Sequence, residues 1–163
     1  MREQSDTSWA IRTATAADLP ELKRVYRAAS LSNEGDAPLL LARPEFLDYV
    51  GDDLARGRTR AAVRDDGRVL GFATLARDAQ GGPELEDLFV DPDRRREGIA
   101  RALVADLIRT GCDPDDRYLS VTGNPHALDF YRAVGFLETG RISTALGTGL
   151  RMRLDLTTAP SRR

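Results

Sequence analysis

The chain has 163 residues, enough for one domain with a substantial core and short for two. Hydrophobic residues make up 41% and charged residues 31%, and the formal net charge of -2 gives no overall bias toward nucleic acid or an anionic membrane. Cys112 is the only cysteine and His126 the only histidine, which excludes an intrachain disulfide, a cysteine-rich metal site and the usual catalytic triads.

We expect one domain over residues 1–163, with loose polar tails at 1–7 and 157–163 and no metal. No apolar run approaches the ~20 residues that span a bilayer. Residues 1–8 lack the apolar core of a secretory signal. The expected location is therefore the cytoplasm.

The first part of the chain predicts a strand and two helices. Residues 9–13 form a short apolar strand. Thr15 then offers an N-cap with Asp18 three residues on, followed by apolar residues at helical spacing: Leu19, Leu22, Val25, Tyr26 and Ala29. A second helix is predicted from Pro44 to a stop at Gly57, with one apolar side made of Phe46, Leu47, Val50 and Leu54.

An antiparallel meander is predicted next. Residues 60–64 and 68–76 are strand-like, and the tight-turn sequence Asp-Asp-Gly at 65–67 joins them. A second turn at 80–83 leads into a third strand at 84–90.

The last part predicts two further helices and three strands. A helix over residues 98–110 ends at Gly111, and a buried strand follows at 117–121. Asn124 caps a helix that ends before Gly135, and residues 136–142 and 150–156 close the sheet. The element order indicates a mixed sheet with helices on its faces, an α/β or α+β fold.

A loop rich in arginine joins the strand 84–90 to the next helix. Residues 90–100 read Val-Asp-Pro-Asp-Arg-Arg-Arg-Glu-Gly-Ile-Ala. A diphosphate fits the first turn of a helix, because backbone N–H groups there have no internal partner and the helix dipole is positive. Gly98 removes a side chain that would block close approach, and Ala100 keeps the next inward position small. For this loop alone, a solvated arginine cluster is an equal alternative.

A second pattern, at residues 124–136, reads Asn-Pro-His-Ala-Leu-Asp-Phe-Tyr-Arg-Ala-Val-Gly-Phe. With both patterns in order, the sequence resembles the Gcn5-related N-acetyltransferase (GNAT) superfamily over residues 84–140. The acetyl-CoA loop of that family, Arg/Gln-x-x-Gly-x-Gly/Ala, is matched by Arg95, Gly98 and Ala100, after a Val-x-Pro at residues 90–92. The later segment, Asn-x-x-Ala-x-x-Phe-Tyr-x-x-x-Gly-Phe, is matched at every fixed position.

The resemblance implies a mostly antiparallel central sheet with helices on both faces. Two parallel strands, here 84–90 and 117–121, would splay into a V-shaped cleft that holds acetyl-CoA (coenzyme A). The pantetheine arm would pair with the first strand, the diphosphate would bind the loop, and Asn124 and Tyr131 would lie near the thioester. The implied cofactor-binding residues are Leu88, Phe89, Val90, Arg95, Arg96, Glu97, Gly98, Ile99, Ala100, Asn124 and Tyr131.

Acetyl transfer to an amine needs a base, because a lysine-like ammonium has a pKa near ~10.4. Glu84 and Glu86 share one strand face by alternation, and the family's base is often a glutamate on this strand, so both are candidates with Glu86 preferred. Asp87 would point the other way unless a bulge intervenes. The resemblance implies Tyr131 as the acid for the leaving thiolate, with a packed helix aromatic as the alternative. Carbonyl donors would be backbone N–H groups near Leu88 and Phe89.

Six other residues have simpler expected roles. Trp9 and Tyr26 are expected in the core, His126 is expected to be exposed, and Cys112 is expected in a loop. Phe46 and Tyr49 would either line the acceptor pocket or pack the core.

The expected function is an N-acetyltransferase that moves an acetyl group directly from acetyl-CoA to a primary amine of a small molecule or a protein. The alternative is a non-catalytic acyl-CoA-binding sensor or structural domain of the same fold. A nucleotide-phosphate enzyme is disfavoured because the loop lacks the Lys-Ser/Thr ending of a P-loop. No nucleic-acid or membrane partner is expected, and a homodimer is allowed for, since closing strands often mediate dimers in this family.

Overall fold

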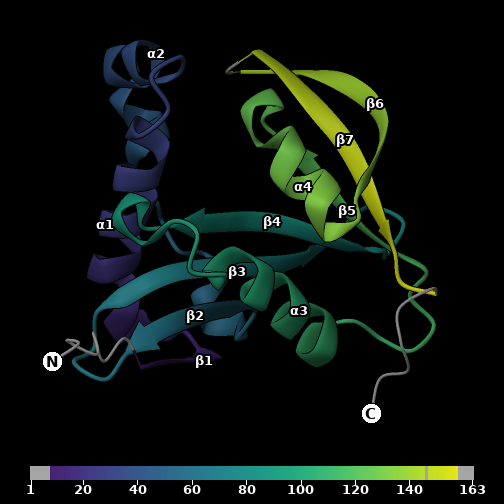
Figure 1. The fold of residues 1–163 in the computed structure, drawn as a ribbon, viewed down its shortest axis with the longest axis horizontal. Coiled ribbons are helices and arrows are strands. Elements are labelled where there is room, and N and C mark those ends of the chain that lie inside the picture. The colour runs from purple at the N-terminus through teal and green to yellow at the C-terminus, as the bar shows by residue number, and fades with distance from the viewer. Residues whose placement is uncertain (1–7, 146, 158–163) are drawn as a thin grey trace, which may run out of the picture.

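The computed structural model describes residues 8–145 and 147–157, and in this part of the chain seven strands form one sheet (Figure 1). Their order across the sheet is β1-β2-β3-β4-β5-β7-β6, and β4 and β5 are the parallel pair. The strands are β1 (Trp9–Thr13), β2 (Thr59–Arg64), β3 (Val69–Arg77), β4 (Pro83–Val90), β5 (Tyr118–Gly123), β6 (Leu137–Thr144) and β7 (Gly147–Asp155). The mixed, mostly antiparallel sheet expected from the sequence is confirmed.

The helices join these strands and cover the sheet. The α-helices are α1 (Leu19–Leu31), α2 (Ala37–Ala42), α3 (Ile99–Gly111) and α4 (Leu128–Val134). Short 3-10 turns precede or separate them: η1 (Ala16–Asp18), η2 (Pro44–Leu47), η3 (Leu54–Arg56), η4 (Pro92–Arg94) and η5 (Pro125–Ala127). None of the helices in the described ranges is both long and apolar enough to cross a bilayer.

The two parallel strands separate soon after they meet. Residue pairs join β4 to β5 at Glu84–Ser120 and Leu85–Val121, and no later pair is formed between them in the described residues. Beyond this junction β4 stays paired with β3 as far as Val90, while β5 stays paired with β7. In Figure 1, β4 runs toward α1, whereas β6 and β7 rise on the other side of α4. The predicted V-shaped splay is therefore confirmed.

Two hydrophobic clusters hold the helices against the sheet. Adjacent residues of a strand point to opposite faces, so Phe72 and Ala73 of β3 enter different clusters. Phe72 packs with residues of α1 such as Leu22, whereas Ala73 belongs to the cluster that contains Leu103 of α3. Trp9 and Tyr26 pack against these clusters, which confirms their predicted place in the core.

The predicted helix from Pro44 to Gly57 is wrong. The backbone becomes extended at Asp48, with φ -96° and ψ 108°, and left-handed at Gly51, with φ 75°. Only the 3-10 turns η2 and η3 form, and the second ends at the left-handed Gly57. Of the predicted apolar side, Leu47 and Leu54 are buried, whereas Val50 is 62% exposed, and the segment also buries Tyr49.

Other boundaries differ less from the prediction. The short helix α2 was missed, and the two closing strands run over 137–144 and 147–155 instead of 136–142 and 150–156. The tail predicted at 1–7 lies outside the described residues, as does all of the second tail except Thr157.

Candidate functional site

The loop before α3 exposes the start of that helix. Gly98 is left-handed, with φ 77°, a conformation that glycine adopts without strain. Its carbonyl accepts the first bond of the helix from the Ala102 N–H at 3.0 Å. The amides of Ile99, Ala100 and Arg101 therefore precede the hydrogen-bonded ladder of the helix. A Cβ on Gly98 would meet nothing within 4 Å, so the space beside Gly98, where the helix begins, is open.

A buried carboxylate fixes the beginning of the same loop. Asp91 is 3% exposed, and it accepts hydrogen bonds from the Asp93 N–H at 3.0 Å and from Arg24 of α1 at 2.9 Å. Burial alone would raise its pKa, but the bonds from Arg24 and from the backbone hold the pKa of Asp91 below its usual range. Sequence reasoning did not find this anchor, because its two partners lie far apart in the chain.

The three arginines of the loop have different surroundings. Arg94 forms an ion pair with Glu97 at 3.4 Å, and Arg95 donates to the hydroxyl of Ser32 at the end of α1. Arg96 is exposed and has a positive φ of 68°. The loop therefore presents a cationic rim over the open amides of α3.

A β-bulge interrupts β4 beside the junction with β5. Thr74 lies opposite Asp87 and Leu75 lies opposite Leu85, so Glu86 has no residue across from it on β3. The extra residue reverses the alternation after it, and Asp87 shares the face of Thr74. The sequence expectation that Asp87 points away from the two glutamates held only for an unbulged strand, and the bulge corrects it.

The carboxylates near the bulge have unequal partners. Glu84 is tied by an ion pair to Arg151 of β7 at 3.0 Å. A hydrogen bond with Asp53, partial burial and the neighbouring negative charges raise the pKa of Glu86 to about 7. Burial raises the pKa of Asp87, although a hydrogen bond with Thr74 acts in the opposite direction. Asp53, on the irregular segment that was predicted as a helix, is a member of this group that the sequence did not reveal.

Buried hydroxyls and aromatic rings line the α1 side of this group. The hydroxyls of Thr59 and Thr74 are hydrogen-bonded at 2.9 Å and fully buried. The ring of Tyr26 packs edge-on against Phe89 with centroids 4.8 Å apart. Burial, together with the charge of Asp87, raises the pKa of both Tyr26 and Tyr49. Tyr49 thus packs the core and also lies within electrostatic reach of the carboxylates, while Phe46 is half-buried and its carbonyl accepts the Tyr26 hydroxyl at 2.5 Å.

The other arm of the splay carries Tyr131. Tyr131 is 7% exposed, and its ring packs edge-on against Phe136, with centroids 5.4 Å apart. Burial raises the pKa of Tyr131 to about 12. Gly123, the last residue of β5, makes room for this ring, because a Cβ there would lie 2.9 Å from Tyr131 Cε2. The phenol therefore stays protonated throughout the physiological pH range.

Asn124 comes directly after β5, and its side chain forms two hydrogen bonds. Its Oδ1 accepts the His126 N–H at 2.9 Å, which caps η5, and its Nδ2 donates to Asp36 at 2.6 Å. His126 is exposed, as predicted. Cys112 ends α3 and packs partly against the core. The structure thus places Leu88–Val90 and the arginine loop on one arm of the splay, and Asn124 and Tyr131 on the other.

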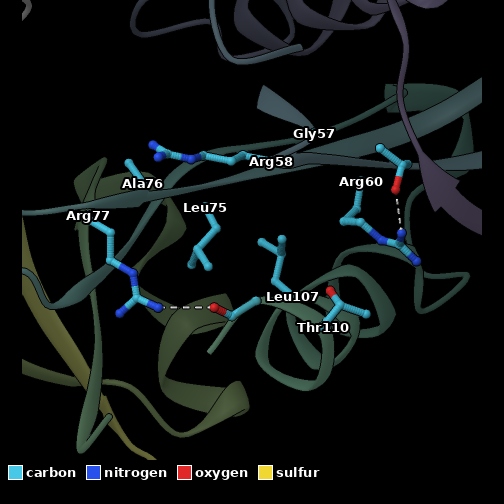
Figure 2. A pocket seen from close by; sticks show the side chains of 10 residues that line it. Gly57, Arg58, Arg60, Leu75, Ala76, Arg77, Leu107 and Thr110 are labelled. Atoms are coloured by element: carbon cyan, nitrogen blue, oxygen red, sulfur yellow. Dashed lines mark hydrogen bonds between the residues drawn. The ribbon is translucent and has the colours of Figure 1, made fainter. Parts of the chain in front are cut away.

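A separate pocket lies at the opposite end of α3 from the arginine loop. Figure 2 shows Leu75 and Leu107 between Arg77 on one side and Arg60 on the other. The cavity measures about 320 Å³. Arg77 donates to the Gly111 carbonyl at 3.1 Å and Arg60 to Asp106 at 2.6 Å, so both cations already have partners. With ~1.5 Å of rise per residue, the length of α3 separates this pocket from the arginine loop.

Comparison with protein families gives one match over most of the chain. The acetyltransferase (GNAT) domain matches residues 45–156. The chain is 32% identical over 99 residues to peptidyl-lysine N-acetyltransferase YjaB of Salmonella typhimurium, covering 61% of this chain and 63% of that protein. It is 34% identical over 124 residues to mycothiol acetyltransferase of Mycolicibacterium vanbaalenii, covering 69% of this chain and 36% of that protein. The chain therefore spans less than two thirds of either relative.

Solved structures share the fold. The PaiA N-acetyltransferase from Thermoplasma acidophilum, in complex with coenzyme A, has a TM-score of 0.68 at 19% identity, over 91% of this chain and 99% of that one. The ribosomal-protein-alanine N-acetyltransferase from Brucella melitensis has a TM-score of 0.64 at 25% identity, over 90% of this chain and 99% of that one.

Proposed function

We infer an activity for this chain from the premise that it belongs to the GNAT acetyltransferase family. The chain transfers the acetyl group of acetyl-CoA directly to a primary amine of a small molecule or a protein. The observation that carries this proposal is the separation of β4 from β5 after Leu85, beside the open amides that begin α3.

The separated edge of β4 suits the cofactor's arm. From Glu86 to Val90, the edge of β4 opposite β3 has no strand beside it among the described residues, so N–H and C=O groups on that edge would be available to pair with the amides of an extended pantetheine. The diphosphate then meets the amides at the start of α3 and the cationic rim that includes Arg95. Among the backbone donors of β4, those near Leu88 and Phe89 would stabilise the developing negative charge on the carbonyl.

The carboxylates at the bulge supply the base. We assign this role to Glu86, since a pKa of about 7 suits a group that must accept a proton near neutral pH. Asp87 and Asp53 lie close enough to keep that pKa raised. Glu84 is the second choice, because its ion pair with Arg151 competes for its carboxylate. The amine would approach from the α1 side, where Tyr26 and Tyr49 line the wall.

Tyr131 supplies the acid. A phenol that keeps its proton up to a pKa of about 12 is able to donate a hydrogen bond to the sulfur as the thiolate leaves. Neither this role nor that of Glu86 involves a metal. Asn124, on the same arm, would contact the cofactor near its thioester.

Two measurements test the proposal. Calorimetric titration with coenzyme A and with ATP should show a clear preference for coenzyme A. Release of free thiol from acetyl-CoA should then depend on an added amine. The panel should include lysine peptides and peptides with N-terminal alanine, because a sequence relative is named for peptidyl-lysine and a solved structure of similar fold for ribosomal-protein alanine. Binding without thiol release for any amine would favour the non-catalytic acyl-CoA-binding domain. Absence of coenzyme A binding would contradict both.

A further inference from the structure

The loop between α1 and α2 contacts both arms of the splay. Residues 32–36, the bridging loop, begin directly after α1 and end directly before α2. At one end of this loop, Ser32 accepts a hydrogen bond from Arg95 of the α3 loop. At the other end, Asp36 accepts a hydrogen bond of 2.6 Å from Asn124, which follows β5. The bridging loop therefore joins two segments whose strands have already diverged.

The middle of the loop adds a third contact to the second arm. A Cβ placed on Gly35 would lie 3.3 Å from Nε2 of His126, so the backbone of the loop lies against the start of η5. The loop is also internally ordered, because Asn33 accepts the Gly35 N–H at 2.9 Å through its side chain and the Asp36 N–H at 3.1 Å through its carbonyl. An ordered segment thus crosses from one arm to the other.

The two side chains that hold this loop, Arg95 and Asn124, are also the ones that the proposed function assigns to cofactor binding. Arg95 is the cation of the diphosphate loop, and Asn124 lies at the thioester end of the cleft. We propose that the bridging loop is a strap across the cleft that competes with coenzyme A for Arg95 and Asn124. This inference rests on the proposed cofactor site, and it makes loop release part of cofactor binding.

Asp36 has an alternative partner when the strap opens. It occupies the position before α2 but gives no capping bond to that helix, and its backbone is in the helical region instead of the extended one that capping requires. With only six residues, α2 has few internal bonds and gains from a cap. The Ala37 N–H already donates to the Asn33 carbonyl and Pro38 has no N–H, so a change at the Asp36 backbone would move its carboxylate from Asn124 to the Leu39 N–H. In this proposal the strap exchanges its bond to Asn124 for a capping bond within its own segment.

Coenzyme A affinity tests the competition. In the proposal, coenzyme A must break the hydrogen bonds that Asp36 and Ser32 form with the two arms. Asp36→Ala and Ser32→Ala should therefore each bind coenzyme A about fivefold more tightly, which corresponds to the loss of one hydrogen bond of ordinary strength. Asp65→Ala, in the exposed turn between β2 and β3, is the matched control and should leave the dissociation constant unchanged. Circular dichroism would verify that the variants are folded. Unchanged or weaker binding by Asp36→Ala would overturn the strap.

Hydrogen exchange gives a second readout that needs no substitution. Coenzyme A should slow amide exchange along residues 86–101 and accelerate it in residues 33–36, because the ligand would cover the first segment and release the second. Slower exchange in both segments would mean that the loop closes over the ligand, and the proposed competition would be wrong. If the unaltered protein fails to bind coenzyme A, the cofactor site itself is refuted. If it binds and Arg95→Ala binds poorly, while Asp36→Ala matches the parent, the competition alone fails.

Discussion

Glu86 is the extra residue of the β4 bulge, and its position explains why a carboxylate with a pKa of about 7 exists on the surface of this protein. The bulge turns Asp87 to the same side, and the irregular segment after η2 brings Asp53 to it. Neighbouring carboxylates cannot all ionise at low cost, so a proton is retained by the group. The local backbone thus prepares a base without any histidine.

Replacing this base should affect turnover more than binding. Glu86→Gln should lower kcat by about 10²-fold to 10⁴-fold at pH 7, the usual range for loss of general base catalysis, while the KM for acetyl-CoA changes little. In Glu86→Gln, the rise of kcat with pH near pH 7 should also disappear. The matched variant Glu84→Gln should retain most of the activity, and the reverse ranking would transfer the role to Glu84.

The same group makes stability depend on pH. The pKa of Glu86 is raised from its ordinary value of 4.5 to about 7, so between these values the folded chain holds more protons at this site than the unfolded chain does. The free energy of unfolding contributed by Glu86 is therefore present below pH 4.5 and is lost as the pH rises through about 7. Thermal unfolding should show Glu86→Gln gaining stability over the parent at pH 8 and not at pH 4.5. A difference independent of pH would contradict the raised pKa.

The hydroxyl of Tyr131 should matter for chemistry and not for folding. Its ring packs against Phe136 and beside Gly123, and those contacts survive in phenylalanine. Tyr131→Phe should therefore keep its melting temperature and its coenzyme A affinity, yet lose about 10²-fold or more in kcat. Phe130→Leu, which changes the ring beside Tyr131, is the control for an effect of packing alone on activity. Full activity in Tyr131→Phe would remove the tyrosine from the mechanism.

At the scale of elements, the start of α3 carries the strongest prediction. Gly98 and Gly67 are both left-handed, with φ 77° and 87°, and a Cβ at either would meet nothing within 4 Å. Alanine at either position should cost about 1 kcal/mol through backbone strain alone. Gly98→Asp should in addition abolish coenzyme A binding, because a carboxylate would occupy the place of the diphosphate, whereas Gly67→Asp should not. Urea unfolding and calorimetry separate the two effects, and retained affinity in folded Gly98→Asp would contradict the site.

The elements that were predictable are those with a local cause. The strands around the turn at 65–67 and the helix α3 follow from turn glycines and from apolar periodicity, and both are confirmed. The segment 44–57 shows the opposite case. Its apolar residues recur at helical spacing, yet the segment is irregular, and Tyr49 within it packs on Phe72, which lies 23 positions later in the chain.

The candidate site divides in the same way. The arginine loop and Tyr131 could be identified because their signal lies in contiguous motifs. Asp53 and the pair Arg24–Asp91 could not, since each depends on two segments meeting only after folding. The sequence allowed for a bulge in this strand but did not predict one, because the alternation of apolar and polar residues in a short strand does not show which residue is unpaired.

At the scale of the whole molecule, stability rests on cores on both faces of the sheet. Leu103 of α3 is fully buried in the cluster that joins α3 to β5 and α4. Leu103→Ala should lower the free energy of unfolding by about 2–5 kcal/mol, the usual cost of a leucine-sized cavity, with a single cooperative transition in urea. Leu137→Ala, at a side chain that is 71% exposed, should change it by less than about 0.5 kcal/mol. Equal losses would contradict the assigned core.

The junction of β4 and β5 also has a mechanical consequence. The halves of the sheet are joined there through two neighbouring residue pairs, and from Leu85 to Val90 the strand extends about 16 Å at ~3.3 Å per residue. Over that length, a rotation of β4 by about 5° about the junction would change the width of the cleft near Val90 by about 1.4 Å. Small twisting motions would thus widen or narrow the phosphate end of the cleft most, and the end beside Glu86, next to the junction, least.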